Sequence, residues 1–221
     1  MPDDQWADEL EAPDEPEWVW GGYVTPGAVT LIAGRPKSGK STLTCAFAEA
    51  VNGDADSFLD RSLRHGKVLY VSEEGAGTLK PKLTGRIRTL TRDAAWPLPG
   101  WAELIAEATA EAQRIGATVL IIDSLSFWSA GSLGEGQEND SGVMQRILGA
   151  LVAATRAGLA VVLVHHQRKG GGEGGDAVRG SGAIFGAADM LVEVERLDGD
   201  SPPTHRQPAS SVAGLRGTKV V

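Results

Sequence analysis

Cysteine is nearly absent from this chain of 221 residues, which contains one, Cys45. A single thiol excludes an internal disulfide and any zinc site built from several cysteines. Long apolar runs are also missing, since no stretch approaches the roughly 18 consecutive apolar residues that a membrane-spanning helix requires. Residues 1–17 carry eight acidic side chains and no Lys or Arg, so they lack the basic start of a secretory signal. These absences predict a cytoplasmic protein that has no membrane partner.

The acidic charge is concentrated at the N-terminus. The formal net charge is −8, and beyond residue 17 the chain carries 21 acidic and 21 basic side chains. We therefore expect residues 1–19 to form a solvated, disordered tail, with a DNA-mimicking or partner-binding arm as the alternative. The length and a hydrophobic content of 42% suit one α/β domain over residues 20–197. Residues 198–221 are rich in Pro, Ser and Gly and are expected to be a loose extension or the start of a longer segment.

Short apolar, β-branched runs alternate with helical patterns along the chain. Continuous apolar runs are typical of strands buried on both faces of a parallel sheet, and helices between them are typical of βαβ units. The pattern predicts an α/β fold in which a mainly parallel sheet is flanked by helices on both faces. The expected strands are Val29–Ala33, Val68–Ser72, Val119–Asp123, Ala160–Val164 and Met190–Val194, and the expected helices are Ser41–Val51, Trp101–Ile115 and Val143–Ala157.

A glycine-rich motif, Gly-Arg-Pro-Lys-Ser-Gly-Lys-Ser, connects the first expected strand to the first expected helix. Glycines let successive backbone N–H groups turn inward toward a phosphate, and the following helix presents its positive N-terminal end to the same anion. The motif predicts a nucleoside triphosphate, expected to be ATP, with Lys40 reaching its β- and γ-phosphates and Ser41 holding Mg²⁺. The expected nucleotide-binding residues are Gly34, Arg35, Pro36, Lys37, Ser38, Gly39, Lys40, Ser41 and Thr42.

Polar residues close three of the expected strands. Asp123 ends the run Val-Leu-Ile-Ile-Asp, which has the form of a strand that presents an acid to Mg²⁺. Glu73 and Glu74 follow the second strand, and we assign Glu74 as the carboxylate that orients and deprotonates the attacking water. His165 and His166 follow the fourth strand, where His166 is the preferred sensor of the γ-phosphate. A capping aspartate, solvated glutamates and structural histidines are the competing interpretations.

These motifs occur in the order found in RecA-like P-loop ATPases. The set resembles the RepA and DnaB type of hexameric replicative helicase domain, an AAA ATPase of the RepA-like kind. The resemblance is carried by Val-Leu-Tyr-Val-Ser-Glu-Glu, Leu-Ile-Ile-Asp-Ser, His-His-Gln-Arg-Lys and Arg-Gly-Ser-Gly-Ala-Ile, and it covers roughly residues 20–196. It implies a RecA-like core that hydrolyses ATP with Mg²⁺. It also implies a homo-oligomer, a hexameric ring, that acts on single-stranded DNA, with a replication protein as a further partner.

The resemblance also implies roles for particular residues. Glu74 would be the catalytic base and His166 the γ-phosphate sensor. Arg196 would be a finger inserted into the neighbouring subunit's nucleotide, where a guanidinium stabilises charge on the transferring phosphoryl group. Arg179 is the competing candidate for the finger, and a surface ion pair is the simpler interpretation of either arginine.

Other features depart from replicative helicases. The stretch between Leu90 and Trp101 is short and contains proline where relatives have room for another edge strand, and we expect no separate primase-binding or linker domain. The loops expected to face a central channel, residues 129–142 and 170–179, are poor in the basic side chains that single-strand binding normally needs. These departures favour an alternative, a nucleotide-switched regulatory module that binds a protein partner without moving on DNA.

A basic cluster follows the second expected strand. It is most simply the solvated face of a helix, with a phosphate-backbone contact or a seam between subunits as alternatives. Its members are Lys80, Lys82, Arg86, Arg88 and Arg92.

Overall fold

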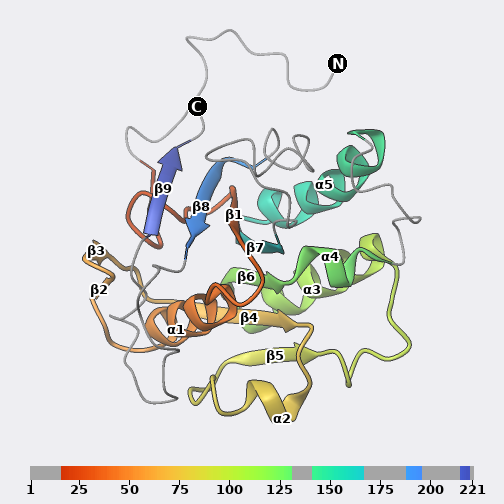
Figure 1. Ribbon diagram of the computed structural model, residues 1–221, viewed down its shortest axis with the longest axis horizontal. Coiled ribbons are helices and arrows are strands. Elements are labelled where there is room, and N and C mark those ends of the chain that lie inside the picture. Colours follow the sequence, from red (N-terminus) through yellow and green to blue (C-terminus); the bar gives the residue numbers. More distant parts are fainter. Residues whose placement is uncertain (1–15, 131–140, 167–187, 196–214, 220–221) are drawn as a thin grey trace, which may run out of the picture.

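The computed structural model describes residues 16–130, 141–166, 188–195 and 215–219. Its strands are β1 (Val29–Gly34), β2 (Ser57–Phe58), β3 (Arg61–Ser62), β4 (Lys67–Ser72), β5 (Arg88–Thr91), β6 (Ala117–Asp123), β7 (Ala160–His166), β8 (Met190–Val194) and β9 (Leu215–Lys219). Its helices are α1 (Lys40–Asn52), α2 (Ala76–Leu79), α3 (Trp101–Ile115), α4 (Leu125–Trp128) and α5 (Ser141–Arg156). Figure 1 shows how they are arranged.

One seven-stranded sheet organises the molecule, with the strand order β5-β4-β6-β7-β1-β8-β9. The strands from β5 to β8 in that order run parallel, and β9 pairs with β8 in the antiparallel direction. The remaining two short strands, β2 and β3, form a separate hairpin. Because parallel strands end at the same edge, the residues that follow β1, β4, β6 and β7 are brought together there, and this is the edge where open α/β sheets bind ligands.

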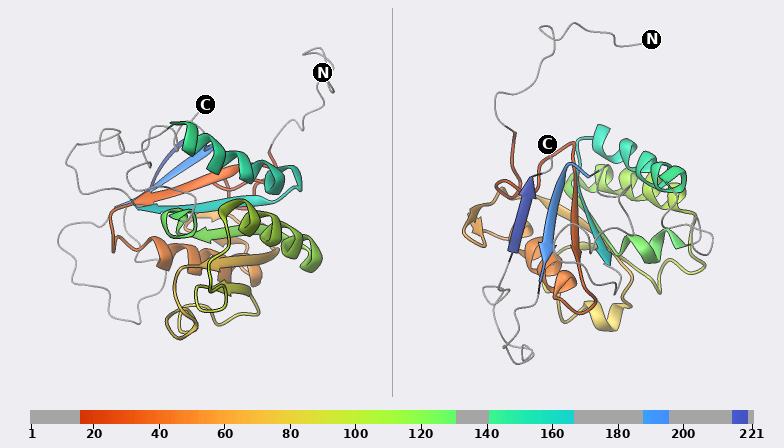
Figure 2. Two further views of the ribbon diagram at one scale, coloured as in Figure 1. Left: turned by 90° about the vertical axis from the view of Figure 1, so that its right-hand side faces the viewer. Right: turned by 45° about the horizontal axis from the view of Figure 1, so that its top comes forward.

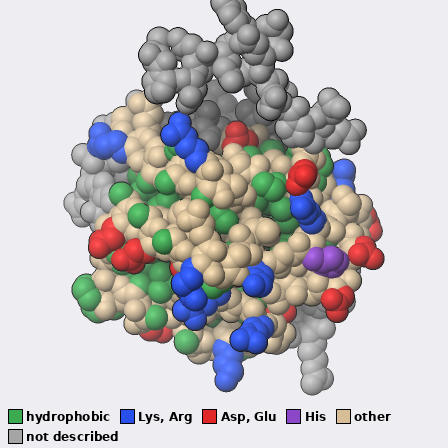
Figure 3. Space-filling view, turned by 180° about the vertical axis from the view of Figure 1, so that it is seen from behind, with side chains coloured by type: hydrophobic (Ala, Val, Ile, Leu, Met, Phe, Trp, Pro, Cys, Tyr) green, Lys and Arg blue, Asp and Glu red, His purple; other side chains and the backbone are tan. Residues whose placement is uncertain are grey.

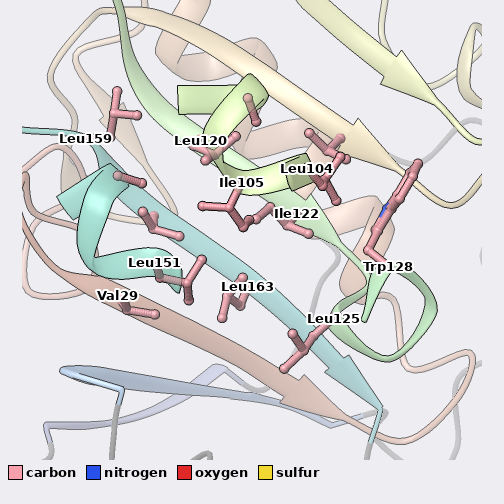
Figure 4. Packing of buried hydrophobic residues seen from close by; sticks show 14 of the residues in the cluster. Val29, Leu104, Ile105, Leu120, Ile122, Leu125, Trp128, Leu151, Leu159 and Leu163 are labelled. Carbon is pink, nitrogen blue, oxygen red and sulfur yellow. The ribbon is translucent and has the colours of Figure 1, made fainter. Parts of the chain in front are cut away.

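Helices cover both faces of the sheet, and each face has its own core (Figure 2). Side chains alternate between the faces along a strand. In β6, Leu120 and Ile122 therefore join the core beneath α3, α4 and α5, whereas Val119 and Ile121 join the core beneath α1. Figure 4 shows the first of these cores, in which side chains of the three helices pack against the central strands. The continuous apolar runs are thus explained by burial on both faces.

The predicted α/β fold, with a mainly parallel sheet flanked by helices, is confirmed. The five predicted strands correspond to β1, β4, β6, β7 and β8, and the three predicted helices to α1, α3 and α5. Four strands were not predicted: β5, which lies at one edge of the sheet, β9, which lies inside the segment 198–221, and the two short strands of the hairpin, β2 and β3. None of the helices in the described part of the chain is long and apolar enough to cross a membrane.

The interpretation of the basic cluster as one helix face is wrong. Helix α2 is only four residues long and ends at Leu79, and the chain then turns until β5 begins at Arg88. Pro81 and Gly85 explain the early end, since neither residue favours a helix interior. Lys and Arg side chains gather at the lower end of the rear face in Figure 3, the end at which α2 and β5 lie in Figure 1.

Candidate functional site

The P-loop, residues 34–41, runs from the end of β1 into the start of α1. Two of its glycines are required by geometry. A Cβ atom on Gly34 would overlap the carbonyl oxygen of Val194, and Gly39 has a φ of 102°, in the left-handed region. Lys37 also has a positive φ, of 64°. The loop is therefore tightly curled, and it leads directly into a helix N-terminus that favours an anion.

Lys40 is the first residue of α1 and is only 3% exposed. Its Nζ donates hydrogen bonds to the carbonyl oxygens of Gly34 at 3.0 Å and Arg35 at 2.8 Å. Burial lowers the pKa of Lys40, while the negative charges of Asp123 and Glu73 oppose this shift. A buried ammonium thus points at the loop itself, where phosphate oxygens can replace the two carbonyls as stronger, charged acceptors.

Asp123 ends β6 and is 1% exposed. Its Oδ2 accepts a hydrogen bond from the Tyr70 hydroxyl at 3.0 Å, and its Oδ1 is buried with no hydrogen-bond partner among the described residues. Burial raises the pKa of Asp123, and the neighbouring hydroxyls of Ser41 and Tyr70 reduce that rise. The two predicted metal ligands, Ser41 and Asp123, therefore lie next to each other.

The oxygens at this edge of the sheet fit a magnesium ion that arrives with a nucleotide. Mg²⁺ at such sites takes one or two protein oxygens and completes its shell with waters and phosphate oxygens. The unpartnered Oδ1 of Asp123 and the hydroxyl of Ser41 are oxygens of this kind. Within the described residues, no group of three or more His, Cys, Asp or Glu side chains could hold a metal ion alone. The site therefore suits a cation whose remaining ligands come from phosphates.

Glu73 lies at the centre of this edge, although the sequence did not single it out. Its backbone N–H donates to the carbonyl oxygen of Asp123 at 2.6 Å, and its side chain accepts a hydrogen bond from Ser124 Oγ at 2.5 Å. Its Oε1 lies 3.7 Å from Nε2 of His166. The neighbouring His166 side chain is the main cause that lowers the pKa of Glu73, and burial opposes it. Glu73 thus connects the ends of β4, β6 and β7.

Glu74, the predicted base, lies in an ion pair with Lys82. Both of its carboxylate oxygens accept hydrogen bonds from Nζ of Lys82, at 2.5 and 2.7 Å. Its backbone N–H donates to Ser72 Oγ at 3.1 Å. Neighbouring residues that leave a strand tend to face opposite sides, which explains why Glu73 and Glu74 contact different residues.

The two histidines at the end of β7 differ in environment. His166 pairs in register with Gly34 of the P-loop, which places the predicted sensor at the edge that holds Lys40 and Asp123. Its Nδ1 is buried and has no hydrogen-bond partner among the described residues. His165 is 9% exposed, and burial lowers its pKa to about 4. The Nδ1 of His165 likewise has no hydrogen-bond partner among the described residues. His165 is therefore a neutral core residue near pH 7, and His166 is the more exposed of the two histidines.

Several predicted features lie outside the described residues. They are the two candidate fingers, Arg179 and Arg196, and most of the two loops expected to face a central channel, residues 129–142 and 170–179. The structure therefore brings together Lys40, Ser41, Asp123 and His166. Glu74 lies one residue beyond Glu73 and pairs with Lys82. The roles predicted for Arg179 and Arg196 stay predictions.

Comparisons with known proteins agree with this geometry. A protein family described as an AAA domain matches residues 1–172. The DNA repair protein RadA of Mycobacterium tuberculosis, in each of two strains, is 31% identical over 185 residues. That alignment covers 82% of this chain and 35% of RadA, so the chain spans about a third of the length of these relatives. The P-loop, both glutamates, Asp123 and His166 all lie within the family match. The chain therefore belongs to the AAA-domain family and has the RecA-like core of a P-loop ATPase.

Proposed function

We propose that this chain binds ATP with Mg²⁺, hydrolyses it, and acts as a ring-forming, helicase-type motor on single-stranded DNA. The observation that carries the proposal is the convergence of a buried lysine and a buried aspartate on the P-loop. Lys40 is 3% exposed and Asp123 is 1% exposed, and both charges face an edge where phosphates and Mg²⁺ would complete their interactions.

Each residue would make a distinct contribution. Lys40 and the loop N–H groups would hold the β- and γ-phosphates, and Ser41 and Asp123 would hold Mg²⁺, which neutralises charge on the phosphate oxygens when bound. Glu74 would orient and deprotonate the attacking water, and His166 would contact the γ-phosphate and report its loss. Since Lys82 holds both oxygens of Glu74, that ion pair must loosen or turn before Glu74 can act as a base.

The proposal that the substrate is DNA has two supports. The motif set resembles hexameric replicative helicase domains, and the similar RadA protein is named for DNA repair. We propose a role in replication or mobile-element biology, as a hexameric ring in which Arg196 reaches the neighbouring subunit's nucleotide and Arg179 is the competing finger. A replication protein is the proposed further partner.

A pair of lysine variants tests the proposed nucleotide site. Lys40→Ala removes the buried ammonium and should abolish measurable ATP hydrolysis. Lys67→Ala is the matched control, because Lys67 is an exposed lysine at the opposite end of β4 that donates to the carbonyl oxygen of Ile115. Steady-state phosphate release, with thermal unfolding to verify the fold, measures both. Equal turnover by the two variants would remove the proposed site.

One observation favours a second candidate, a nucleotide-switched regulatory module that binds a protein partner. The carboxylate assigned as the base lies in an ion pair with Lys82, whose side chain is 32% exposed and so is reachable by a partner. In that case a partner protein, and not DNA, should change ATP turnover. Parallel assays with single-stranded DNA and with a candidate replication protein distinguish the two functions.

A further inference from the structure

Tyr70 is a fully buried polar residue in the middle of β4, and its exposed fraction is 0%. It faces the core beneath α1, together with Cys45 of that helix and Ile121 of β6. Tyr70 pairs in register with Ile121, and Ser72 pairs with Asp123, so Tyr70 and Asp123 are diagonal neighbours on one face of the sheet. The rest of this core is largely apolar, which makes the hydroxyl of Tyr70 expensive to bury unless it is hydrogen-bonded.

The hydrogen bonds of this hydroxyl have a defined direction. An ionised carboxylate only accepts, so the single proton of Tyr70 is donated to Oδ2 of Asp123, at 3.0 Å. The hydroxyl of Thr44 lies 2.7 Å from the Tyr70 oxygen and 3.2 Å from the carbonyl oxygen of Ser41. Because the Tyr70 proton is already used, Thr44 is the donor in the shorter contact and shares its proton with the Ser41 carbonyl. The thiol of Cys45 approaches the same oxygen at 3.6 Å. A donor chain therefore runs from α1 through β4 to the carboxylate at the end of β6.

This series of hydrogen bonds leaves one carboxylate oxygen of Asp123 without a partner. Oδ2 of Asp123 is satisfied by Tyr70, whereas Oδ1 is buried and has no hydrogen-bond partner in the described part of the structure. Thr44 lies three residues after Ser41 on α1, so the helix that carries the P-loop also carries the first donor of the chain. Packing on α1 and β4 therefore determines which oxygen of Asp123 faces the nucleotide.

We propose that Tyr70 is a positioning residue for magnesium binding. It holds Oδ2 of Asp123, presents Oδ1 to the cation, and is itself oriented by Thr44. The inference rests on the proposed function, because it assumes that Asp123 and Ser41 hold Mg²⁺ beside a nucleotide. Tyr70 would not contact substrate or metal, so its loss should change the magnesium requirement and leave metal-free nucleotide binding intact.

The test uses the chain's two tyrosines as a matched pair. Tyr70→Phe removes only the hydroxyl and keeps the ring in the core. Tyr23→Phe is the control, because the Tyr23 ring packs on Trp20 and lies beneath Arg61 at a distance from the site. The probe is fluorescent mant-ATP, with its affinity measured as MgCl₂ is titrated and again in EDTA. Tyr70→Phe should raise the half-maximal Mg²⁺ concentration about tenfold, equivalent to about 1.4 kcal/mol, and Tyr23→Phe should match the wild type.

Threonine variants test whether Thr44 donates to Tyr70. Thr44→Val, which replaces the hydroxyl with a methyl group, should shift the Mg²⁺ requirement the same way, and Thr44→Ser should restore it. The double variant, Tyr70→Phe with Thr44→Val, should need no more Mg²⁺ than Tyr70→Phe alone, because both changes break the same series of hydrogen bonds. Thr109→Val is the control, since the Thr109 hydroxyl is also buried but donates to the carbonyl oxygen of Ile105 in α3.

The outcomes separate the inference from the proposed function. If Mg²⁺ does not strengthen mant-ATP binding to the wild-type chain, the proposed magnesium site itself fails. If the wild type requires Mg²⁺ and Tyr70→Phe has the same requirement, the site stands and the role of Tyr70 is wrong. Equal weakening of Tyr70→Phe in MgCl₂ and in EDTA would also overturn the inference, because a general packing defect would then explain it.

Discussion

The two sides of the nucleotide site are built differently. On the side of the proposed magnesium ligand Asp123, Asp123 and Tyr70 are 1% and 0% exposed and are joined by a buried hydrogen bond. On the side of the proposed base, Glu74 is held by Lys82 in an ion pair whose side chains are 24% and 32% exposed. Buried hydrogen-bonded groups keep one arrangement, whereas an ion pair near solvent can exchange partners at small cost. The comparison indicates that the side of Asp123 is preorganised and that the side of the proposed base, Glu74, can change its contacts.

The largest effect is expected from breaking the preorganised side. Asp123→Asn keeps the shape but removes the charge that Lys40 and Mg²⁺ would face, so ATP hydrolysis should fall by about a hundredfold or more. Steady-state phosphate release measures it, and thermal unfolding verifies the fold. Turnover within about twofold of the wild type would show that Asp123 does not serve the reaction.

The next largest effect distinguishes the roles of Glu73 and Glu74 in hydrolysis. Glu74→Gln should reduce hydrolysis by about a hundredfold while nucleotide affinity stays unchanged, because a general base acts on the reaction and not on binding. Glu73→Gln is the natural comparison, since its side chain contacts Ser124 and His166 instead of Lys82. If Glu73→Gln stops turnover and Glu74→Gln does not, the base has been assigned to the wrong residue of the pair.

A pH measurement tests a buried residue next to the site, His165. The pKa of His165 is lowered to about 4 in the folded chain, below the unfolded value of about 6.5. The unfolded state therefore binds the proton more readily, and stability should be full above pH 6.5 and fall as the pH drops toward 4. The loss should reach about 3 kcal/mol in the wild type and be smaller in His165→Leu.

Urea denaturation at several pH values measures this loss. His65→Gln is the control, because His65 is a histidine whose side chain is 45% exposed. The same acid sensitivity in His165→Leu as in the wild type would mean that His165 is not the group responsible.

The smallest effect is expected on the side of Glu74. Lys82→Met removes the partner of Glu74 and should raise ATP turnover without DNA by up to about fivefold, the equivalent of about 1 kcal/mol for a partly exposed ion pair. Its stability should change by less than about 1 kcal/mol. Lys80→Met is the control, since Lys80 is an exposed neighbour in the same turn. A loss of turnover in Lys82→Met alone would instead mean that Lys82 holds Glu74 in its active position.

Most of the fold could be predicted because its signals are local. The apolar runs of β1, β4, β6, β7 and β8 are continuous, and burial on both faces requires that pattern. Strand β5 was missed because Arg-Thr-Leu-Thr is polar and lies at a sheet edge, where only part of it is buried. Strand β9 was missed because its sequence, Leu-Arg-Gly-Thr-Lys, has no apolar run and depends on pairing with β8.

The site was predictable where a motif carries the chemistry and not where contacts are long-range. Lys40, Ser41 and Asp123 follow from their motifs. Lys82 is eight residues from Glu74, and Tyr70 is 53 residues from Asp123, so both contacts arise only when the sheet and its loops assemble. The direction of Glu73 toward His166 likewise depends on β4 and β7 ending at one edge.

We propose that this edge of the sheet hydrolyses ATP and that DNA stimulates the hydrolysis. The most direct test is steady-state ATP hydrolysis by the wild-type chain at low salt, with and without single-stranded DNA, because electrostatic binding to phosphates is strongest there. We expect turnover that requires Mg²⁺ and rises when DNA is added. Turnover that DNA leaves unchanged would contradict the DNA-acting motor, and no turnover under either condition would contradict the proposed ATPase itself.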